Sequence, residues 1–422
     1  SSEPSIRKSV LAKDVWNKLI QANWNSAEPG ILFWDRIIEN SPADIYSGRY
    51  PAFTTTSTNP CGELPLGSDS CRLLVLNLLN YVTNPFTSNS SFDFDLYSIH
   101  TIKAQRLMDD LIDLEIEKIN KIISKIEKDP EPEHIKSVEL ALWKRFLESA
   151  IQGRRTGTGI TALGDALAAL NIKYGSKESI EMTAKIYNSL QLNAYVSTCI
   201  MAKERGAFPI YDYELEKDHP YVSATVKQDK ELYDLYKKHG RRNIALTTTA
   251  PTGSVSTMTQ TTSGIEPVFL LSYKRRKKIN PSDKNAKVDF IDDMGDKWQE
   301  FVVYHHGVKK WMDVTGETDI EKSPYYGATS AEIDWMASVD IQAAAQKWIC
   351  HSISKTCNLP NSATRELISD VYMKAYDSGC KGFTVYRDGC RTGVLISTKN
   401  KTDQSGRPKE IQSVMAPKRP EK

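Results

Sequence analysis

A loop at residues 59–71 holds the residues best suited to chemistry. It reads NPCGELPLGSDSC and places an amide, a thiol and a carboxylate at alternate positions, as Asn59, Cys61 and Glu63. In an extended segment alternate side chains share one face, so these three are predicted to point into one pocket. A hydrogen-bonding amide, a sulfur suited to nucleophilic or one-electron chemistry and a general base would form a reaction centre. A second thiol, Cys71, ends the segment.

The alternative interpretation of this loop is a turn-rich connection whose cysteine is buried for packing. Free cysteine behaves as a small hydrophobe, and for an arbitrary cysteine that interpretation is the better one.

A second segment, APTGSVS at residues 250–256, is suited to binding an anion. Small residues and a glycine let backbone N–H groups approach a phosphate, and a following helix would add its positive N-terminal end. The segment is not a Walker A loop, because neither Gly-Lys-Ser nor Gly-Lys-Thr follows the glycine. Composition alone favours an ordinary tight turn. The glycines of RRTGTGI, at 154–160, favour a close packing turn over a phosphate site.

Composition excludes several classes of protein. The chain has 422 residues, 40% of them hydrophobic, and a net charge of only +2, so it can bury a large core and has no global field for nucleic acid or acidic membranes. The charge run KRRKK at 274–278 is predicted to be a solvated surface. The sequence has neither a signal-peptide h-region nor an apolar run long enough to span a membrane, which predicts a cytoplasmic location.

Seven scattered cysteines without a CxxC pair argue against a disulfide framework and a zinc site, so no metal ligand is assigned. Four of them, Cys199, Cys350, Cys357 and Cys380, are predicted to lie in helices as core residues. Cys390 is expected near a loop, without a role.

Hydrophobic periodicity predicts helices alternating with short apolar strands, which is typical of an α/β fold. The predicted helices cover 14–23, 31–38, 102–126, 137–152, 161–170, 176–205, 341–356 and 363–378. Strands are predicted at 244–249, 268–273 and 382–386, whereas 72–82 fits a strand or a helix equally. Loop is predicted at 41–59, and charged, irregular surface from 274 to about 338.

The loop and its surroundings resemble ribonucleotide reductases. NPCGE with its second cysteine resembles that family's active-site finger loop. AEPGILFWD, RRTGTGI, ALTTTAPTGSVS, SGIEPVF, QAAAQKW, HSISKT and KGFTVYRDG resemble further segments in the family's order, so the resemblance covers nearly the whole chain. It implies that residues 1–400 form the second half of a ten-stranded α/β barrel with a central finger loop, and that 401–422 form a basic tail or linker.

The resemblance also implies roles in reducing ribonucleotides to deoxyribonucleotides. Cys61 would carry a thiyl radical that removes the ribose 3′ hydrogen, Glu63 would accept the 3′ hydroxyl proton, and Asn59 would bind the sugar hydroxyls. Cys71 would be one of two reducing thiols. Substrate contacts would come from Pro60, Gly62, Pro251, Thr252, Gly253, Ser254 and Val255.

The second reducing thiol has no counterpart here, because no cysteine precedes Asn59. In the family it lies on the first strand of the barrel. We therefore expect the N-terminal half-barrel to be absent, and the other half of the site to come from a second polypeptide or from residues removed before this chain was made. A complementing polypeptide is expected to bind tightly, because an isolated half exposes strand edges and apolar surface. The family further implies a thioredoxin-like reductant and an oligomer. Both chain ends are interpreted as cut or processed.

The radical source is predicted by elimination within the family. The metal-dependent class relays the radical through adjacent tyrosines near the C-terminus, but TVYRDG holds only Tyr386. A glycyl-radical motif is not seen. The sequences of the motifs most resemble the adenosylcobalamin-dependent class, and that cofactor is assigned by analogy. The alternatives are a large subunit of the metal-dependent class and a silent scaffold, although a scaffold would not need the set Asn59, Cys61, Glu63 and Cys71.

Overall fold

The computed structural model describes residues 8–280, 286–292 and 295–390. The predicted tail at 401–422 lies outside the described residues. Residues 8–272 and 304–390 form a larger compact unit, and 273–303 belong to a smaller one.

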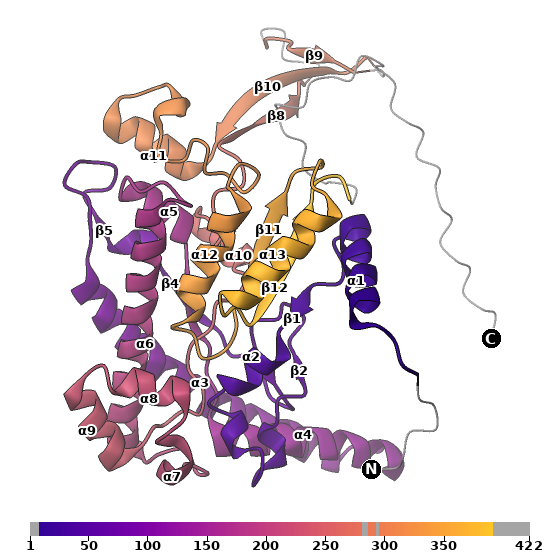
Figure 1. Cartoon of the computed structure of the whole chain (residues 1–422), viewed down its shortest axis with the longest axis vertical. Helices are drawn as coiled ribbons and strands as arrows, with labels where there is room; N and C mark the ends of the chain where they lie inside the picture. The colour runs from indigo at the N-terminus through magenta and orange to yellow at the C-terminus, as the bar shows by residue number, and fades with distance from the viewer. Residues whose placement is uncertain (1–7, 281–285, 293–294, 391–422) are drawn as a thin grey trace. The chain divides into compact units, whose positions relative to one another are not determined.

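Helices make up most of the larger unit (Figure 1). The longest, α3 (Phe94–Glu127), begins where the Asp93 side chain accepts a hydrogen bond from Leu96 N, and α6 (Lys177–Arg205) begins with a matching cap from Ser176. Both confirm predicted helices. The others are α1 (Ala12–Ser26), α2 (Trp34–Glu39), α4 (Glu133–Gly153), α5 (Leu163–Ala169), α7 (Tyr213–Glu216), α8 (Pro220–Val226), α9 (Lys230–His239), α10 (Gly253–Thr259), α11 (His306–Thr315), α12 (Trp335–Gln346) and α13 (Arg365–Asp377).

Short strands and isolated bridges, all paired in parallel, form the central array of the larger unit. Strand β4 (Leu74–Asn77) pairs in parallel with β7 (Thr158–Thr161), and Thr158 bridges to Thr247. Thr249 then bridges to Ile353, just before β11 (Thr356–Leu359), which pairs in parallel with β12 (Gly382–Arg387). These five parallel passes form an open array, and its α/β character confirms the predicted class.

The two ends of this array differ. At one end β1 (Ile31–Leu32) pairs antiparallel with β12, with α12, α13 and α1 packed around β11 and β12 (Figure 1). At the other end β4 has β7 as its one strand partner within the described residues. Two small hairpins complete the unit, β2 (Ser57–Thr58) with β3 (Pro65–Leu66) and β5 (Val82–Thr83) with β6 (Ser91–Phe92).

Several predicted elements were wrong in type or extent. The helix predicted at 31–38 is β1 followed by α2, and the helix predicted at 341–356 ends at Gln346. The segment 244–249 makes isolated bridges, and 268–273 forms no strand before β8 begins at Ser272. The ambiguous run 72–82 is β4, a 3-10 turn and the start of β5.

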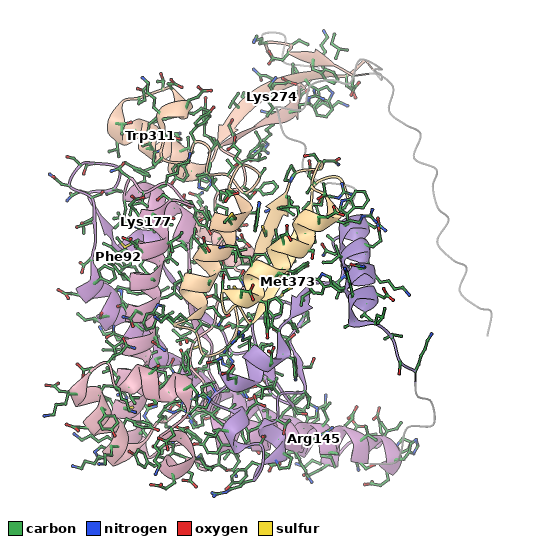
Figure 2. All side chains as sticks on the ribbon, viewed as in Figure 1. Phe92, Arg145, Lys177, Lys274, Trp311 and Met373 are labelled. Atoms are coloured by element: carbon green, nitrogen blue, oxygen red, sulfur yellow. The ribbon has the colours of Figure 1, made fainter. Side chains whose placement is uncertain are left out.

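The smaller unit corrects the expectation of irregular chain after residue 274. It contains a three-stranded sheet in the order β8 (Ser272–Lys278), β10 (Lys297–Tyr304), β9 (Phe290–Ile291). Lys274 and Arg276 pair with Glu300 at 3.1 and 3.0 Å. The KRRKK run lies exposed on β8, as a solvated surface should (Figure 2).

Buried side chains form three clusters in the larger unit, one of them beneath β11 and β12. Cys199 lies in α6 as predicted. Cys350, Cys357 and Cys380 are buried too, but they follow a helix or lie on β11, so their helical assignment was wrong. Cys390 is half-buried in a turn after β12. Within the described residues, none of the helices has both the length and the apolar character needed to cross a membrane.

Candidate active site

The chemistry-bearing loop is the turn of the hairpin formed by β2 and β3. Gly62 adopts φ 80°, a left-handed conformation that glycine takes without strain, and its N–H donates to Asn59 O at 3.0 Å. The Asn59 side-chain oxygen accepts from Leu64 N at 3.0 Å. The segment is therefore a closed turn, and the prediction that three alternate side chains share one extended face was wrong.

The turn separates the thiol from the carboxylate by burial. Cys61 is exposed, whereas Glu63 is only 1% exposed. One Glu63 carboxylate oxygen, Oε2, is buried without a hydrogen-bond partner among the described residues. Partial burial and the nearby charge of Glu63 raise the pKa of the Cys61 thiol. The Cys61 thiol thus lies within electrostatic range of Glu63, whose Oε2 is still able to accept a hydrogen bond.

Main-chain contacts anchor the turn on the parallel strands. Glu63 O accepts from Ser352 N and from Thr248 Oγ1, both at 2.9 Å. Ser352 O in turn accepts from Thr249 N at 3.3 Å. The carboxylate-bearing residue is therefore fixed at the junction of the passes through Thr249 and Ile353.

Cys71 lies exposed where the chain leaves the hairpin. Burial, followed by the charges of Glu63, Asp69 and Cys61, raises the pKa of its thiol, so the structure brings Cys71 near Glu63 and Cys61. The adjacent Arg72 is buried and pairs with Asp69 at 3.1 Å and with Glu115 of α3. These ion pairs fix the backbone beside the thiol.

The RRTGTGI segment serves packing. Arg155 pairs with Asp69 at 3.0 Å. A Cβ on Gly157 would lie 2.6 Å from Arg72 O, and one on Gly159 would lie 2.4 Å from Thr248 O. Only glycine lets β7 approach its neighbours this closely, so the contacts favour the packing interpretation over a phosphate site.

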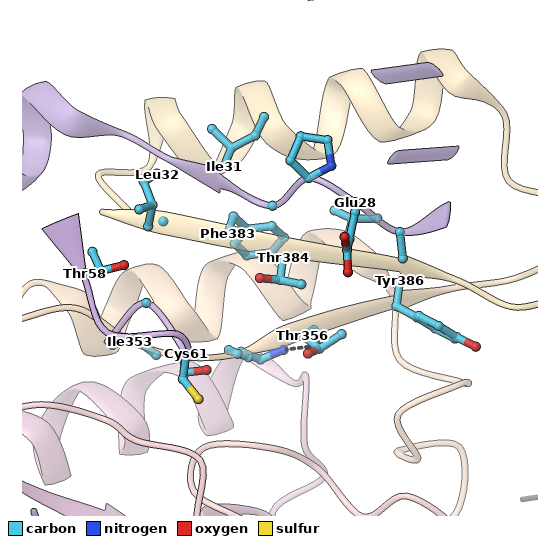
Figure 3. Close-up of a pocket in the computed structure, with 18 of the residues that line it drawn as sticks. Glu28, Ile31, Leu32, Thr58, Cys61, Ile353, Thr356, Phe383, Thr384 and Tyr386 are labelled. Carbon is cyan, nitrogen blue, oxygen red and sulfur yellow. Dashed lines mark hydrogen bonds between the residues drawn. The ribbon is translucent and has the colours of Figure 1, made fainter. Parts of the chain in front are cut away.

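A cavity of about 500 Å³ opens beside the thiol (Figure 3). Of the predicted site residues, Pro60, Cys61 and Gly62 line it, whereas Asn59, Glu63, Cys71 and 251–255 do not. The remaining lining comes from Thr58, 27–32, 353–356 and β12. Glu28 and Tyr386, which are labelled in Figure 3, both line this cavity although they come from segments at opposite ends of the sequence.

Sequence reasoning missed the polar residues of this cavity, including Glu28, Lys355 and Thr384. Each lies in a segment that resembles the family, AEPGILFWD, HSISKT or KGFTVYRDG. The signal was therefore present, but nothing in the spacing showed that these three segments meet.

The predicted phosphate loop, 251–255, is anchored through the side chain of Thr252. Thr252 is buried, and its hydroxyl pairs with Thr161 Oγ1 and accepts from Gly264 N, both at 2.8 Å. Gly253, Ser254 and Val255, at the start of α10, are exposed. A Cβ on Gly253 would meet no atom within 4 Å. The loop is thus anchored at Thr252 and exposed to solvent at 253–255.

An acidic cluster elsewhere, Asp109, Asp110 and Asp113, has its carboxylates close enough to hold a metal ion. Arg154 pairs with Asp109 and Asp113 at 2.8 Å, and Arg205 pairs with Asp110 at 2.6 Å. These ion pairs assign the cluster a structural role.

Comparison with known proteins gives a consistent family. Residues 1–386 match the model of the ribonucleotide reductase barrel domain. The chain is 28% identical to the vitamin B12-dependent ribonucleoside-diphosphate reductase of Thermoplasma acidophilum, over 96% of this chain and 46% of that protein. It is 29% identical to the protein of the same name from Mycobacterium tuberculosis strain CDC 1551, over 92% and 48%. The chain thus spans about half the length of these relatives.

A solved structure has the same fold. The class Id ribonucleotide reductase alpha subunit of Actinobacillus ureae superposes with a TM-score of 0.58 and 19% identity, covering 89% of this chain and 61% of that one. With the family match, it confirms the prediction that the open array is part of an α/β barrel.

Proposed function

We propose that this chain, which belongs to the ribonucleotide reductase barrel-domain family, catalyses the thiyl-radical reduction of ribonucleotides to deoxyribonucleotides as part of a larger assembly. The observation that carries the proposal is the hairpin turn. It presents the Cys61 thiol at a cavity and holds a buried carboxylate with a free oxygen beside it.

The residues of the turn divide the chemistry. Cys61 as a thiyl radical takes the ribose 3′ hydrogen, and Glu63 accepts the 3′ hydroxyl proton through its free oxygen. The 2′ hydroxyl leaves as water, two thiols supply two electrons and become a disulfide, and Cys61 returns the hydrogen. Cys71 is one of those thiols. In the unliganded turn the Asn59 oxygen is engaged by Leu64 N, so Asn59 would bind the sugar through its amide N–H groups.

The substrate phosphates are assigned to 251–255. The exposed glycine, serine and valine at the start of α10 offer backbone N–H groups, and the buried Thr252 hydroxyl keeps the loop in place. Pro60 and Gly62 would contact the ribose.

Adenosylcobalamin is the proposed radical source, because the relatives from Thermoplasma acidophilum and Mycobacterium tuberculosis carry vitamin B12 in their names. When bound, it supplies the organic radical that oxidises the Cys61 thiol. The cavity of about 500 Å³ at Cys61 falls in the size range of small-ligand pockets and has polar lining from Glu28, Lys355 and Thr384, which fits a nucleoside-sized group.

A complementing polypeptide is proposed to supply the other half of the barrel. Cys71 has no cysteine partner in a disulfide among the described residues, and β4 beside it has an unpaired edge. That polypeptide would bring the second reducing thiol, and a thioredoxin-like protein would reduce the resulting disulfide. Cytoplasmic location belongs to the same proposal.

The test is nucleotide reduction by the chain reconstituted with its complementing half. Cys61→Ser should abolish turnover, whereas Cys390→Ser, in a turn outside the site, should leave it unchanged. Unchanged turnover with Cys61→Ser would overturn the radical assignment. Activity without adenosylcobalamin but with a metal-radical small subunit would instead identify the metal-dependent class.

A further inference from the structure

Lys381 is a buried lysine whose partners are all main-chain carbonyls. It immediately precedes β12, is 3% exposed, and its Nζ donates to Cys350 O at 2.6 Å, His351 O at 2.9 Å and Asn40 O at 3.3 Å. An ammonium has three N–H donors, and all three are used. Within the described residues no carboxylate lies at ion-pair distance from it.

The charge is costly in this place. Burial lowers the pKa of Lys381 to about 8, opposed by the Cys350 thiol and by Asp44. Its own charge helps to lower the pKa of His351 and His219, after the larger effect of burial on each. An uncharged side chain would avoid this cost, so any benefit of the ammonium lies in the hydrogen bonds that it makes.

What the bonds hold is the segment beneath the active-site turn. Residues 350 and 351 run directly into Ser352, whose N–H donates to Glu63 O. The same segment is tied by Gln346 Nε2, which donates to His351 O at 3.1 Å, and by His351 Nε2, which lies 3.0 Å from Thr156 O. Lys381 also links this segment to Asn40 and to the start of β12.

We propose that Lys381 is a positioning residue, whose ammonium fixes residues 350–352 and through Ser352 sets the position of Glu63 relative to Cys61. The effect on turnover rests on the proposed function, but the effect on the turn does not.

The sign of the pH dependence separates this role from plain stabilisation. Because the folded-state pKa is depressed, the unfolded chain binds more protons above pH 8, and the contribution of Lys381 to the free energy of unfolding rises between about 8 and the ordinary lysine pKa. The neutral amine has only two weaker donors, so the hold on 350–352 loosens over the same interval. Local order and global stability should move in opposite directions.

The experiment compares the full chain with the variants Lys381→Met and Lys374→Met. Lys374 is the control: it lies on the partly exposed side of α13 and pairs with Asp340 of α12. Amide hydrogen exchange of Ser352, expressed as a protection factor, and denaturant unfolding are measured from pH 7 to 9.5. Lys381→Met should lower Ser352 protection at pH 7 about tenfold, the equivalent of one hydrogen bond. In the unchanged chain and in the control, protection of the Ser352 amide should fall only above pH 8. Over the same pH range the contribution of Lys381 to the free energy of unfolding should rise.

Equal Ser352 protection in the unchanged chain and Lys381→Met at pH 7 would overturn the proposal. If that variant does not fold, the pH series on the unchanged chain decides, and flat protection up to pH 9.5 is then the contrary result. In the reconstituted enzyme Lys381→Met should lower kcat more than it changes KM. A lasting exchange effect without any reductase activity would count against the proposed function and leave the positioning role standing.

Discussion

The two edges of the parallel array are finished differently. At the β12 edge β1 pairs with β12, and both strands line the cavity at Cys61. At the β4 edge, Cys71 and Leu73 are exposed, and β7 is the one strand beside β4 in the described part of the chain. Under the proposed function, the closed edge would hold the residues that start the radical reaction, and the open edge would hold one of the two reducing thiols.

If the proposed function holds, this difference indicates which half of the reaction the chain supports by itself. A cavity, a thiol and a buried carboxylate are in place without a partner. Supplying electrons requires a second thiol within disulfide distance of Cys71, with Cα atoms about 5.5–6 Å apart. A strand added at the β4 edge would supply such a neighbour and remove an aggregation-prone edge together.

The largest expected effect tests the closed side. Glu63→Gln keeps the shape of the side chain but removes the base, so turnover of the reconstituted enzyme should fall by about 10²–10⁴-fold, the usual contribution of a general base. Steady-state nucleotide reduction measures it, with Glu117→Gln on the exposed surface of α3 as control. Turnover within a factor of about two of the unchanged enzyme would remove Glu63 from the mechanism.

The open edge can be tested with a pair of prolines in β4. Leu74 N donates to Gly157 O, so N–H groups of alternate residues, Leu74 and Leu76, face β7, and that of Val75 faces the open side. Leu76→Pro should cost about 1–3 kcal/mol in the free energy of unfolding, because it removes a ladder hydrogen bond and leaves the acceptor on β7 unpaired. Val75→Pro should cost far less yet block activation by the complementing half.

Denaturant melts of the chain alone and activity after reconstitution separate the two prolines. If Val75→Pro reconstitutes as well as the unchanged chain, no strand adds at this edge.

The sheet between the two edges depends on one close approach. In Gly159→Ala the new Cβ would lie 2.4 Å from Thr248 O, which forces β7 and the pass through Thr247 apart. We expect a loss of about 1–3 kcal/mol in the free energy of unfolding. Gly48→Ala, where a Cβ meets nothing within 4 Å, should change it by less than about 0.5 kcal/mol. Equal urea midpoints for the two variants would show that the strands can relax.

The smallest effect concerns the thiol itself. Burial and the charge of Glu63 raise the pKa of Cys61, so its alkylation by iodoacetamide should reach half its maximal rate above the pH of about 8.5 typical of free cysteine. Glu63→Gln should move this midpoint to lower pH, because it removes a negative charge. Peptide mass spectrometry resolves Cys61 from Cys71. A midpoint unaffected by the substitution would place the carboxylate too far away to act on the thiol.

The sequence predicted local structure better than assembly. Long amphipathic helices such as α3 and α6 were found because their periodicity and caps are local. The turn at Asn59 was misjudged because Gly62 closes it through a left-handed backbone. The strands around Thr247 and Ile353 are recognisable only by their partners, which lie far away in sequence. Residue types and spacing singled out Cys61, Glu63 and Cys71, and the resemblance supplied their roles. Lys355, Thr384 and Lys381 could be identified only once the structure showed which segments meet.

The pairing of Ile31 with Phe383 joins residues more than three hundred positions apart. A contact of such long range closes a large loop, so it contributes little until most of the chain has been synthesised. During translation β1 and the hairpin that carries Cys61 are made long before β12. Until β12 is made, nascent chains would expose unpaired strand edges that can associate with one another. Expression of this protein should therefore benefit from slow synthesis or chaperone supply more than its helical content suggests.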